Sequence, residues 1–500
     1  MSITLTHLVL FVTVVSALLT VAVYALHRGP KNLLISYLQN WVGSLFLVSG
    51  GVKAVDPLGT AYKMEQYFAE FEATFADTWA NFLAPMFPWL SEYAIGFSVF
   101  MIVLEMVLGV ALIVGWRPKL TSRVLLAVLL FFTVLTGFTY LTGFVPNGVN
   151  FFSFSQWGEY VDTNMRVTDC GCFGDFLKLE PRTSFLKDVV LLVPGFLFVF
   201  LYGKKHRLWT AGTRTGLVIA SLVGTLLVCF ASYVWDIPAF DFRPFKEGVN
   251  IREQQLAEEE AMGNVEILAF QLKNKASGTV VEVPYEQYMK EYKNYPKDEW
   301  ETVQQIQTEP AIPSTKISEF EVSDVNGEDV TEAILSDPNY SFMVVAYQLD
   351  YENNPANVTM YDTTYVVDTV AIADAPADAA PQLVRRVGDV KERQAVQNNY
   401  TFAADYLARW TEGVNPTLNE AQAAGLNVYA ISKYQNPDAL DDFRHATQSS
   451  FPVYVADDIL LKTIVRSNPG VVLLRNGEII KKWHWRKLPS FSEIRAEFMK

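Results

Sequence analysis

Residues 93–115 read YAIGFSVFMIVLEMVLGVALIVG, an apolar run that a single charged residue, Glu105, interrupts. Roughly 20 residues of this kind, coiled as a helix, cross the ~30 Å hydrocarbon core of a bilayer. The run therefore predicts a transmembrane helix, and it decides that this part of the chain folds in a membrane. Glu105 lies near the middle of that helix, where an unpaired carboxylate would be costly.

Further apolar runs lie on both sides of this stretch within the first 235 residues. Together they predict six transmembrane helices, at about 5–26, 33–52, 93–115, 123–144, 184–202 and 215–235. The first run lacks the basic start and the small-residue cleavage site of a signal peptide, so we expect it to remain as a helix. The sequence thus divides into a transmembrane helical domain at 1–235, a connector at 236–314 and a further domain at 315–500.

Lysine and arginine are concentrated in three of the short loops between these helices. They are Arg28, Lys31, Arg117, Lys119, Arg123, Lys204, Lys205, Arg207 and Arg214. All three loops fall on one side of the predicted bundle, and short loops rich in basic residues stay in the cytoplasm. The sequence therefore predicts a multi-pass protein in which both termini and the whole C-terminal half lie on the outer side.

The chain has three cysteines, and Cys170 and Cys172 stand in a Cys-Gly-Cys turn between two predicted helices. Thiols this close can form a strained disulfide, and strained, exposed disulfides tend to be labile or catalytic. We give equal weight to two hypotheses: a redox pair, or a structural pin in which Gly171 permits the tight turn. Cys229 lies within the last predicted helix, where a small apolar packing role is the simpler interpretation.

Three charged residues lie at membrane depth or at the outer end of a helix. Glu105 is in the third predicted helix, and Lys53 and Asp56 are at the outer end of the second. Such residues face the interior of a bundle, because a charge without a partner is costly in hydrocarbon. One hypothesis is a site for protons or a quinone. The simpler one, which we favour, is an interhelical hydrogen bond that fixes the packing.

Several short motifs occur in order between residues 33 and 202. They are SGGVKAVDP at 49–57, GTAYKM at 59–64, LEMVLG at 104–109, CGCFG at 170–174, and Lys187-Asp188 at the start of a helix. In this order they resemble the DoxX/MauE-like family of bacterial inner membranes. The resemblance implies a four-helix core to which the first and last helices are added. It also implies a link to thiol oxidation and to the maturation of disulfide-rich exported proteins.

From about residue 315, apolar runs and polar turns alternate as they do in α/β domains. We expect strands at 342–347, 426–431, 469–474 and 478–485, the last two as a hairpin around Asn476-Gly477. We expect helices at 400–410, 417–424, 437–447 and 490–499. In the connector we expect helices at 253–262 and 285–307 and a strand at 280–284.

A βαβ unit followed by an antiparallel hairpin and a helix resembles the thioredoxin-like fold. In that fold a cis-proline precedes the hairpin, and Pro469 stands at this position. The Cys-x-x-Cys of thioredoxin-like enzymes is replaced here by QLDYENNP at 348–355, and no cysteine follows Cys229. The resemblance implies a redox-inactive α/β domain that docks a partner along the groove beside Pro469, with residues 350–398 as a long insertion.

Composition and motifs argue against other classes of function. The formal charge of −14, without a basic stripe, argues against nucleic-acid binding. The five histidines are dispersed, so the sequence predicts no metal site. No cofactor is indicated with certainty, and a quinone stays an open alternative.

We therefore expect a bacterial inner-membrane protein that supports thiol–disulfide or maturation chemistry of exported proteins in the periplasm. Its predicted site residues are Cys170 and Cys172 as the catalytic pair, Glu105, Lys53, Asp56, Lys187 and Asp188 as accessory groups, and Pro469 for partner binding. The alternative is a non-enzymatic, membrane-anchored subunit or scaffold of a larger cell-envelope complex, in which the cysteines are structural. A periplasmic client protein or a complex partner is expected in either case.

Overall fold

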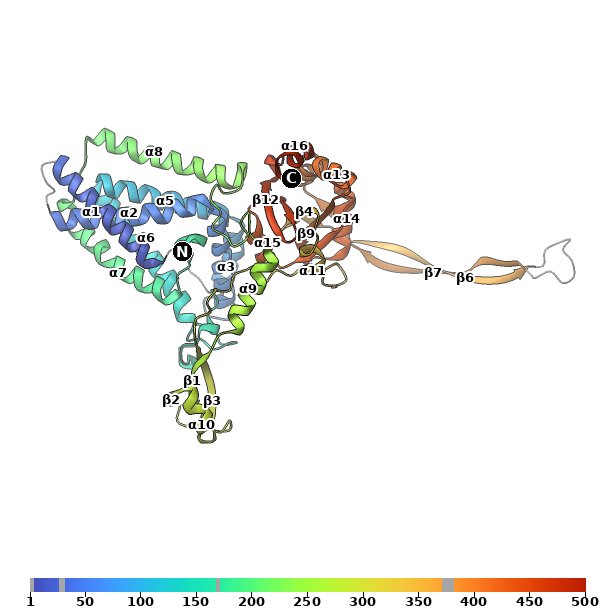
Figure 1. The fold of residues 1–500 in the computed structure, drawn as a ribbon, viewed down its shortest axis with the longest axis horizontal. Helices are drawn as coiled ribbons and strands as arrows, with labels where there is room; N and C mark the ends of the chain where they lie inside the picture. The colour runs from blue at the N-terminus through green and yellow to red at the C-terminus, as the bar shows by residue number, and fades with distance from the viewer. Residues whose placement is uncertain (1–3, 27–31, 168–170, 371–381) are drawn as a thin grey trace.

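The computed structural model describes residues 4–26, 32–167, 171–370 and 382–500. Among the described residues, six helices are long and apolar enough to cross a membrane, as predicted. They are α1 (Leu5–Leu26), α2 (Leu33–Val55), α5 (Ala94–Val114), α6 (Pro118–Thr142), α7 (Pro181–Phe200) and α8 (Ala211–Phe230). The N-terminus and the C-terminal domain lie at the same end of this bundle (Figure 1). Arg28 and Lys31, which contributed to the predicted topology, lie outside the described residues.

The centre of the bundle is formed by α2, α5, α6 and α7. Helix α2 packs along α5, and α6 packs along α7, while α1 contacts α2 and α8 contacts α5 from outside. Large apolar side chains of α1, such as Phe11, Leu18 and Val21, are exposed. Exposure of this kind is ordinary for a helix whose outer face meets lipid, so the exposed surface of α1 indicates a bilayer environment.

Helices α2 and α5 approach closely because two glycines face each other where they cross. A Cβ atom at Gly109 would lie 2.8 Å from Leu47 and 3.0 Å from the Gly43 carbonyl oxygen. Small residues at such crossings allow backbone-to-backbone van der Waals packing, which drives helix association in lipid. The crossing fixes the position of α5 against α2, and Glu105 lies one turn away on α5.

The segment between α2 and α5 contains helix α3 (Pro57–Ala76) and the short helix α4 (Met86–Glu92). Asp56 caps α3, because its carboxylate accepts a hydrogen bond from the Gly59 amide at 3.1 Å. Pro57 occupies the first helical turn, where its missing N–H costs nothing. Helix α3 lies between the bundle and the C-terminal domain (Figure 1), so it forms a platform between them.

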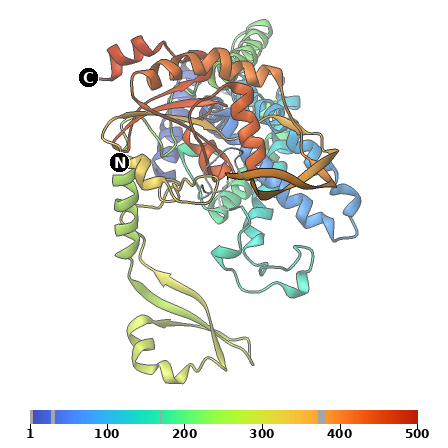
Figure 2. The same cartoon turned by 90° about the vertical axis from the view of Figure 1, so that its right-hand side faces the viewer.

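The connector is more structured than the sequence predicts. It contains α9 (Ile251–Gly263), α10 (Tyr285–Glu291) and an antiparallel sheet in the order β2 (Val280–Pro284), β1 (Ile267–Asn274), β3 (Trp300–Gln307). The predicted helix over 285–307 is wrong beyond Glu291, because residues 300–307 pair with β1 instead. Figure 2 shows this sheet standing away from the rest of the molecule. Phe245 and Ile251, in contrast, are buried in the core of the C-terminal domain.

The C-terminal α/β domain is built on a sheet in the order β10-β9-β4-β11-β12. The strands are β4 (Tyr340–Ala346), β9 (Asn427–Lys433), β10 (Val453–Ala456), β11 (Gly470–Arg475) and β12 (Glu478–His484). Strands β4, β9 and β10 are parallel, and β11 is antiparallel to both of its neighbours. Phe342 and Val344 enter one core while Met343 and Val345 enter the other. Burial on both faces explains why β4 reads as an unbroken apolar run.

Helices cover both faces of this sheet. Helices α13 (Asn415–Ala423), α14 (Pro437–Thr447) and α16 (Phe491–Phe498) pack on one face, and α11 (Thr331–Leu335) and α15 (Asp458–Ile464) on the other. The predicted helices at 417–424, 437–447 and 490–499 are confirmed, as is the hairpin around Asn476-Gly477.

The predicted helix over 400–410 is only partly correct. Residues 400–402 form strand β8 (Tyr400–Phe402), which pairs with β5 (Tyr351–Asn353), and α12 (Ala404–Ala408) begins only after it. The insertion forms a long antiparallel hairpin of β6 (Ala356–Val370) and β7 (Gln382–Gln397). This hairpin projects away from the bundle (Figure 1).

Replacing Gly109 by alanine is expected to destabilise the α2–α5 crossing by about 1–3 kcal/mol, because the new methyl group would overlap Leu47. Gly96→Ala on the same helix is a matched control, since no described heavy atom lies within 4 Å of its Cβ position. Thermal unfolding of the full chain in detergent measures the difference. Equal melting temperatures for the two variants would contradict the close crossing.

Candidate functional site

Cys172 lies in the segment between α6 and α7. It follows Gly171, whose φ of +59° favours glycine, and it precedes the short turn η4 (Gly174–Phe176). Cys172 is a free cysteine and is half-buried. Its backbone carbonyl accepts a hydrogen bond from Ser49 Oγ of α2 at 2.9 Å. Cys170, the other member of the predicted pair, lies outside the described residues.

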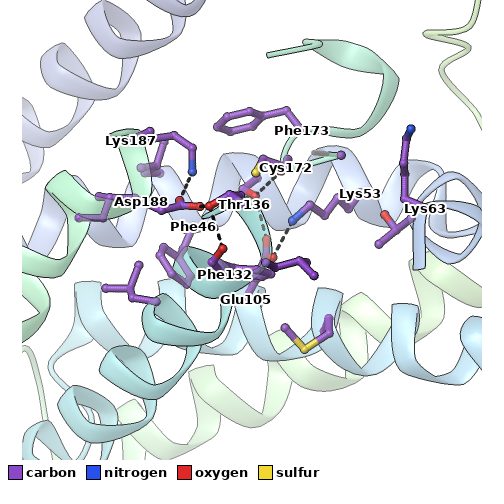
Figure 3. Close-up of a pocket in the computed structure, with 18 of the residues that line it drawn as sticks. Phe46, Lys53, Lys63, Glu105, Phe132, Thr136, Cys172, Phe173, Lys187 and Asp188 are labelled. Carbon is purple, nitrogen blue, oxygen red and sulfur yellow. Dashed lines mark hydrogen bonds and ion pairs between the residues drawn. The ribbon is translucent and has the colours of Figure 1, made fainter. Parts of the chain in front are cut away.

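A cavity of about 80 Å³ opens beside Cys172 (Figure 3). Side chains from α2, α3, α5, α6 and α7 line it, and many of them are apolar. Lys53, Glu105, Lys187 and Asp188, all predicted as accessory residues, lie on its wall together with Cys172. The fold therefore brings together five of the predicted site residues that lie far apart in the sequence.

Lys53 of α2 and Glu105 of α5 form a salt bridge with 2.6 Å between Nζ and Oε1. Their side chains are 7% and 2% exposed. Ser49 Oγ lies 2.8 Å from Glu105 Oε2, so this hydroxyl links the carboxylate to the backbone of Cys172. The Lys53 ammonium also lies 5.4 Å from the centre of the Phe132 ring. Because each charge needs the other in a low-dielectric bundle, the pair fixes α2 against α5.

Lys187 and Asp188 are neighbours near the outer end of α7, and their charged groups form a second ion pair. Asp188 is buried and accepts a hydrogen bond from Thr136 Oγ1 of α6 at 3.0 Å. The Lys187 side chain is 18% exposed, and its ammonium is directed toward Asp188 (Figure 3). Through the hydrogen bond between Asp188 and Thr136, this second pair ties α6 to α7.

The surroundings of Cys172 act on its thiol in opposite directions. Burial raises the pKa of the Cys172 thiol, and the Lys187 ammonium opposes this rise. The thiolate is the reactive form of cysteine, so burial disfavours this form and the Lys187 ammonium favours it. Within the described ranges, no three His, Cys, Asp or Glu side chains form a group that could hold a metal ion. A thiol and two ion pairs therefore line the same cavity.

Asp56, the remaining accessory residue, does not line the cavity and instead pairs with Arg466 of the C-terminal domain. Arg466 Nε lies 2.9 Å from both carboxylate oxygens of Asp56. The same guanidinium lies 3.4 Å from Asp175, three residues after Cys172. Burial would raise the pKa of Asp56, but Arg466 outweighs burial and lowers it below the ordinary value of 3.8. Arg466 thus connects the C-terminal domain to the cysteine segment.

Further contacts seat the C-terminal domain on α3. Lys462 Nζ lies 3.4 Å from Glu65 Oε2 and 4.8 Å from the centre of the Tyr62 ring. Tyr62 in turn meets Tyr347, at the end of β4, edge to face with 6.1 Å between the ring centres. The sequence analysis missed Arg466 and Lys462, because nothing local to 458–466 indicates a partner about 400 positions earlier.

Pro469, predicted as the partner-binding residue, is buried, and its peptide bond to Asn468 is cis. Asn468 Nδ2 donates a hydrogen bond to the Gln348 carbonyl at 2.7 Å, and Arg409 donates to the Asn468 carbonyl at 3.1 Å. The segment before Pro469 is therefore held by contacts within the chain, including those of Arg466 to the membrane domain.

Lys53→Met is expected to destabilise the bundle by about 3–5 kcal/mol, because it leaves Glu105 buried without a partner. Adding Glu105→Gln should restore much of the loss, since it removes the orphaned charge. Thermal unfolding in detergent at neutral pH measures both variants. Arg393→Met, which breaks the exposed pair with Asp362, is the control and should cost at most about 1 kcal/mol. A loss this small for Lys53→Met would contradict the structural role of the pair.

Arg466→Gln is expected to loosen the C-terminal domain, with faster amide hydrogen exchange in α3 and α15. Arg475→Gln, which removes a surface contact with Tyr340 in the same domain, is the control and should leave α3 unchanged.

Because the pKa of Asp56 is lowered, the contribution of Asp56 to docking is complete above pH 3.8 and is lost only as the pH falls through the lower native value. Loosening already between pH 5 and 6 would contradict this ion pair; this range is about one to two pH units above the ordinary value.

No protein-family model matches this chain, and neither does any curated protein or solved structure. The function proposed below therefore depends on the geometry of the residues themselves.

Proposed function

We propose that this protein carries out thiol–disulfide exchange on exported proteins at the periplasmic face of a bacterial inner membrane. The observation that carries the proposal is the meeting of the Cys172 thiol with Lys53, Glu105, Lys187 and Asp188 around one cavity. Ionisable groups within a transmembrane bundle are costly and commonly functional. The resemblance to the DoxX/MauE-like family points in the same direction.

The step that these residues support is exchange with a client disulfide. The Cys172 sulfur, as the thiolate, attacks one client sulfur, so the Cys172–client bond forms and the client disulfide breaks. The proton lost by Cys172 ends on the released client sulfur. The Cys170 thiolate then attacks the Cys172 sulfur, and the client leaves as a dithiol while Cys170 and Cys172 become a disulfide. The client gains the two electrons and two protons that the pair loses, and the reverse sequence oxidises a client dithiol.

The charged residues have distinct roles in this step. Lys187 and Lys53 would stabilise the Cys172 thiolate, as cations beside a reactive cysteine do. Glu105 and Asp188 hold these two ammonium groups in place through the ion pairs. Ser49 positions the Cys172 backbone through its hydrogen-bond contact.

The proposal places no quinone in the cavity. Its volume of about 80 Å³ is roughly half that of a ~150 Å³ cavity that holds benzene. A ring in this place would require the lining side chains to move. No step of the proposed exchange passes through a quinone, and the electrons are exchanged with protein sulfur.

The C-terminal domain supports the proposal through its topology. Parallel strands β4 and β9, the antiparallel hairpin of β11 and β12, and the cis bond before Pro469 are features of the thioredoxin-like fold. This domain contains no cysteine. We propose that it is a redox-inactive thioredoxin-like domain that presents client proteins to Cys172. Its contact through Arg466 and Asp175 keeps it beside the cysteine segment.

A second candidate function is that of a membrane-anchored subunit or scaffold in a cell-envelope complex. The two buried ion pairs are compatible with this scaffold function, because helix packing alone explains them and no catalytic role is needed. The projecting hairpin of β6 and β7 offers surface for a complex partner. In this function Cys170 and Cys172 would only shape their loop.

In native membranes, Cys170 and Cys172 are expected to be partly oxidised and to shift with mild reductant or oxidant. Differential alkylation followed by mass spectrometry measures the fraction of each state. Cys229 is an internal control, because it is buried in the bundle and should not respond. A Cys170–Cys172 pair locked in one state would contradict thiol exchange. If serine at both positions leaves the cellular phenotype intact while deletion of 315–500 abolishes it, the scaffold function holds.

A further inference from the structure

A groove of about 600 Å³ lies between the membrane domain and the C-terminal domain, and many charged side chains line it. Its lining residues come mainly from α3, from α15 and from the segments 171–178 and 238–243. Lys63 and Gly171 line both this groove and the cavity beside Cys172. The groove therefore leads from the outer compartment to the thiol. Its volume falls in the range of roughly 300–1,000 Å³ that is usual for ligand sites.

The charged side chains of the groove largely neutralise one another. The pairs are Arg466 with Asp56 and Asp175, Lys462 with Glu65, Arg243 with Asp241, and Arg166 with Glu70. Walls with paired charges offer little net attraction to a small anion or cation. They do offer many hydrogen-bonding groups, which suits an occupant recognised through its main chain.

Two exposed apolar side chains stand among these charged groups. Phe240 is 66% exposed and Ile459 is 43% exposed, and both line the groove. Large apolar side chains left exposed within a polar rim are typical of surfaces that bind a partner. Gly171 and Gly174 line the groove near the cysteine segment, where the lack of a side chain lets another backbone approach.

We infer that this groove binds an extended segment of the client polypeptide and brings a client cysteine to Cys172. The inference rests on the proposed thiol exchange and adds where the client binds and in what form. Alternate side chains of an extended segment would contact Phe240 and Ile459, while its main chain meets the polar walls. The client site is then formed by both domains together. This differs from the predicted site beside Pro469, which is buried.

The test uses the full chain in detergent with Cys170→Ser and Cys229→Ala, so that Cys172 is the only thiol. One probe is a short, neutral peptide of alternating apolar and polar residues whose central cysteine is activated as a pyridyl disulfide. The other is the same pyridyl disulfide on mercaptoethanol. Release of pyridinethione gives the rate of mixed-disulfide formation at Cys172 with each probe.

We expect the peptide to react about tenfold faster than the small reagent, as apolar burial of one or two side chains would provide. Adding Phe240→Ser and Ile459→Ser should remove most of this advantage and leave the rate of the small reagent unchanged. Val325→Ser is the matched control, because Val325 is 46% exposed in the same half of the chain and does not line the groove. It should change neither rate.

The outcomes separate the two proposals. Equal rates for the two probes, or a peptide advantage that survives Phe240→Ser and Ile459→Ser, would overturn the groove as the client site while the thiol exchange still stands. Failure of both probes to modify Cys172 would overturn both, because the thiol would then be closed to the outer compartment.

Discussion

A carboxylate and an ammonium group buried in hydrocarbon cannot be left apart, and the half of this bundle that surrounds Cys172 depends on that constraint. Glu105 has to meet Lys53, so α5 is held against α2 at a depth that the glycine crossing permits. Asp188 in turn has to meet Lys187, and it holds α6 through Thr136. The segment around Cys172 is attached to the first pair through Ser49. A cavity with charged walls follows from these requirements rather than from any single helix.

The same requirement that buried charges be paired also governs the contact between the two halves of the chain. Arg466 is almost completely buried, and a buried guanidinium requires carboxylates on the surface that receives it. Asp56, which caps α3, and Asp175, three residues after Cys172, supply them. The C-terminal domain is therefore seated on the membrane domain, and its position is tied to the position of Cys172.

Local patterns were sufficient to predict much of the fold. Long apolar runs gave the membrane helices, and the Asn476-Gly477 turn between apolar runs gave the β11–β12 hairpin. The prediction of a helix over 285–307 failed for residues 300–307. A charged, amphiphilic segment does not reveal whether it pairs with a strand elsewhere in the chain, and residues 300–307 pair with β1. Residues 453–456 are too short for a recognisable strand, and only their pairing with β9 defines one.

The candidate site could be predicted as a set of residue types but not as an arrangement. Unusual charges in apolar surroundings identified Glu105 and Lys53, yet only the packing of separate helices brings them to Cys172. Burial raises the pKa of this thiol, while the neighbouring ammonium groups favour its thiolate. An occupant that displaces water from the groove would strengthen this attraction, because charges interact more strongly as the local dielectric constant falls. In the proposed exchange, the reactivity of Cys172 would then rise when a client occupies the groove.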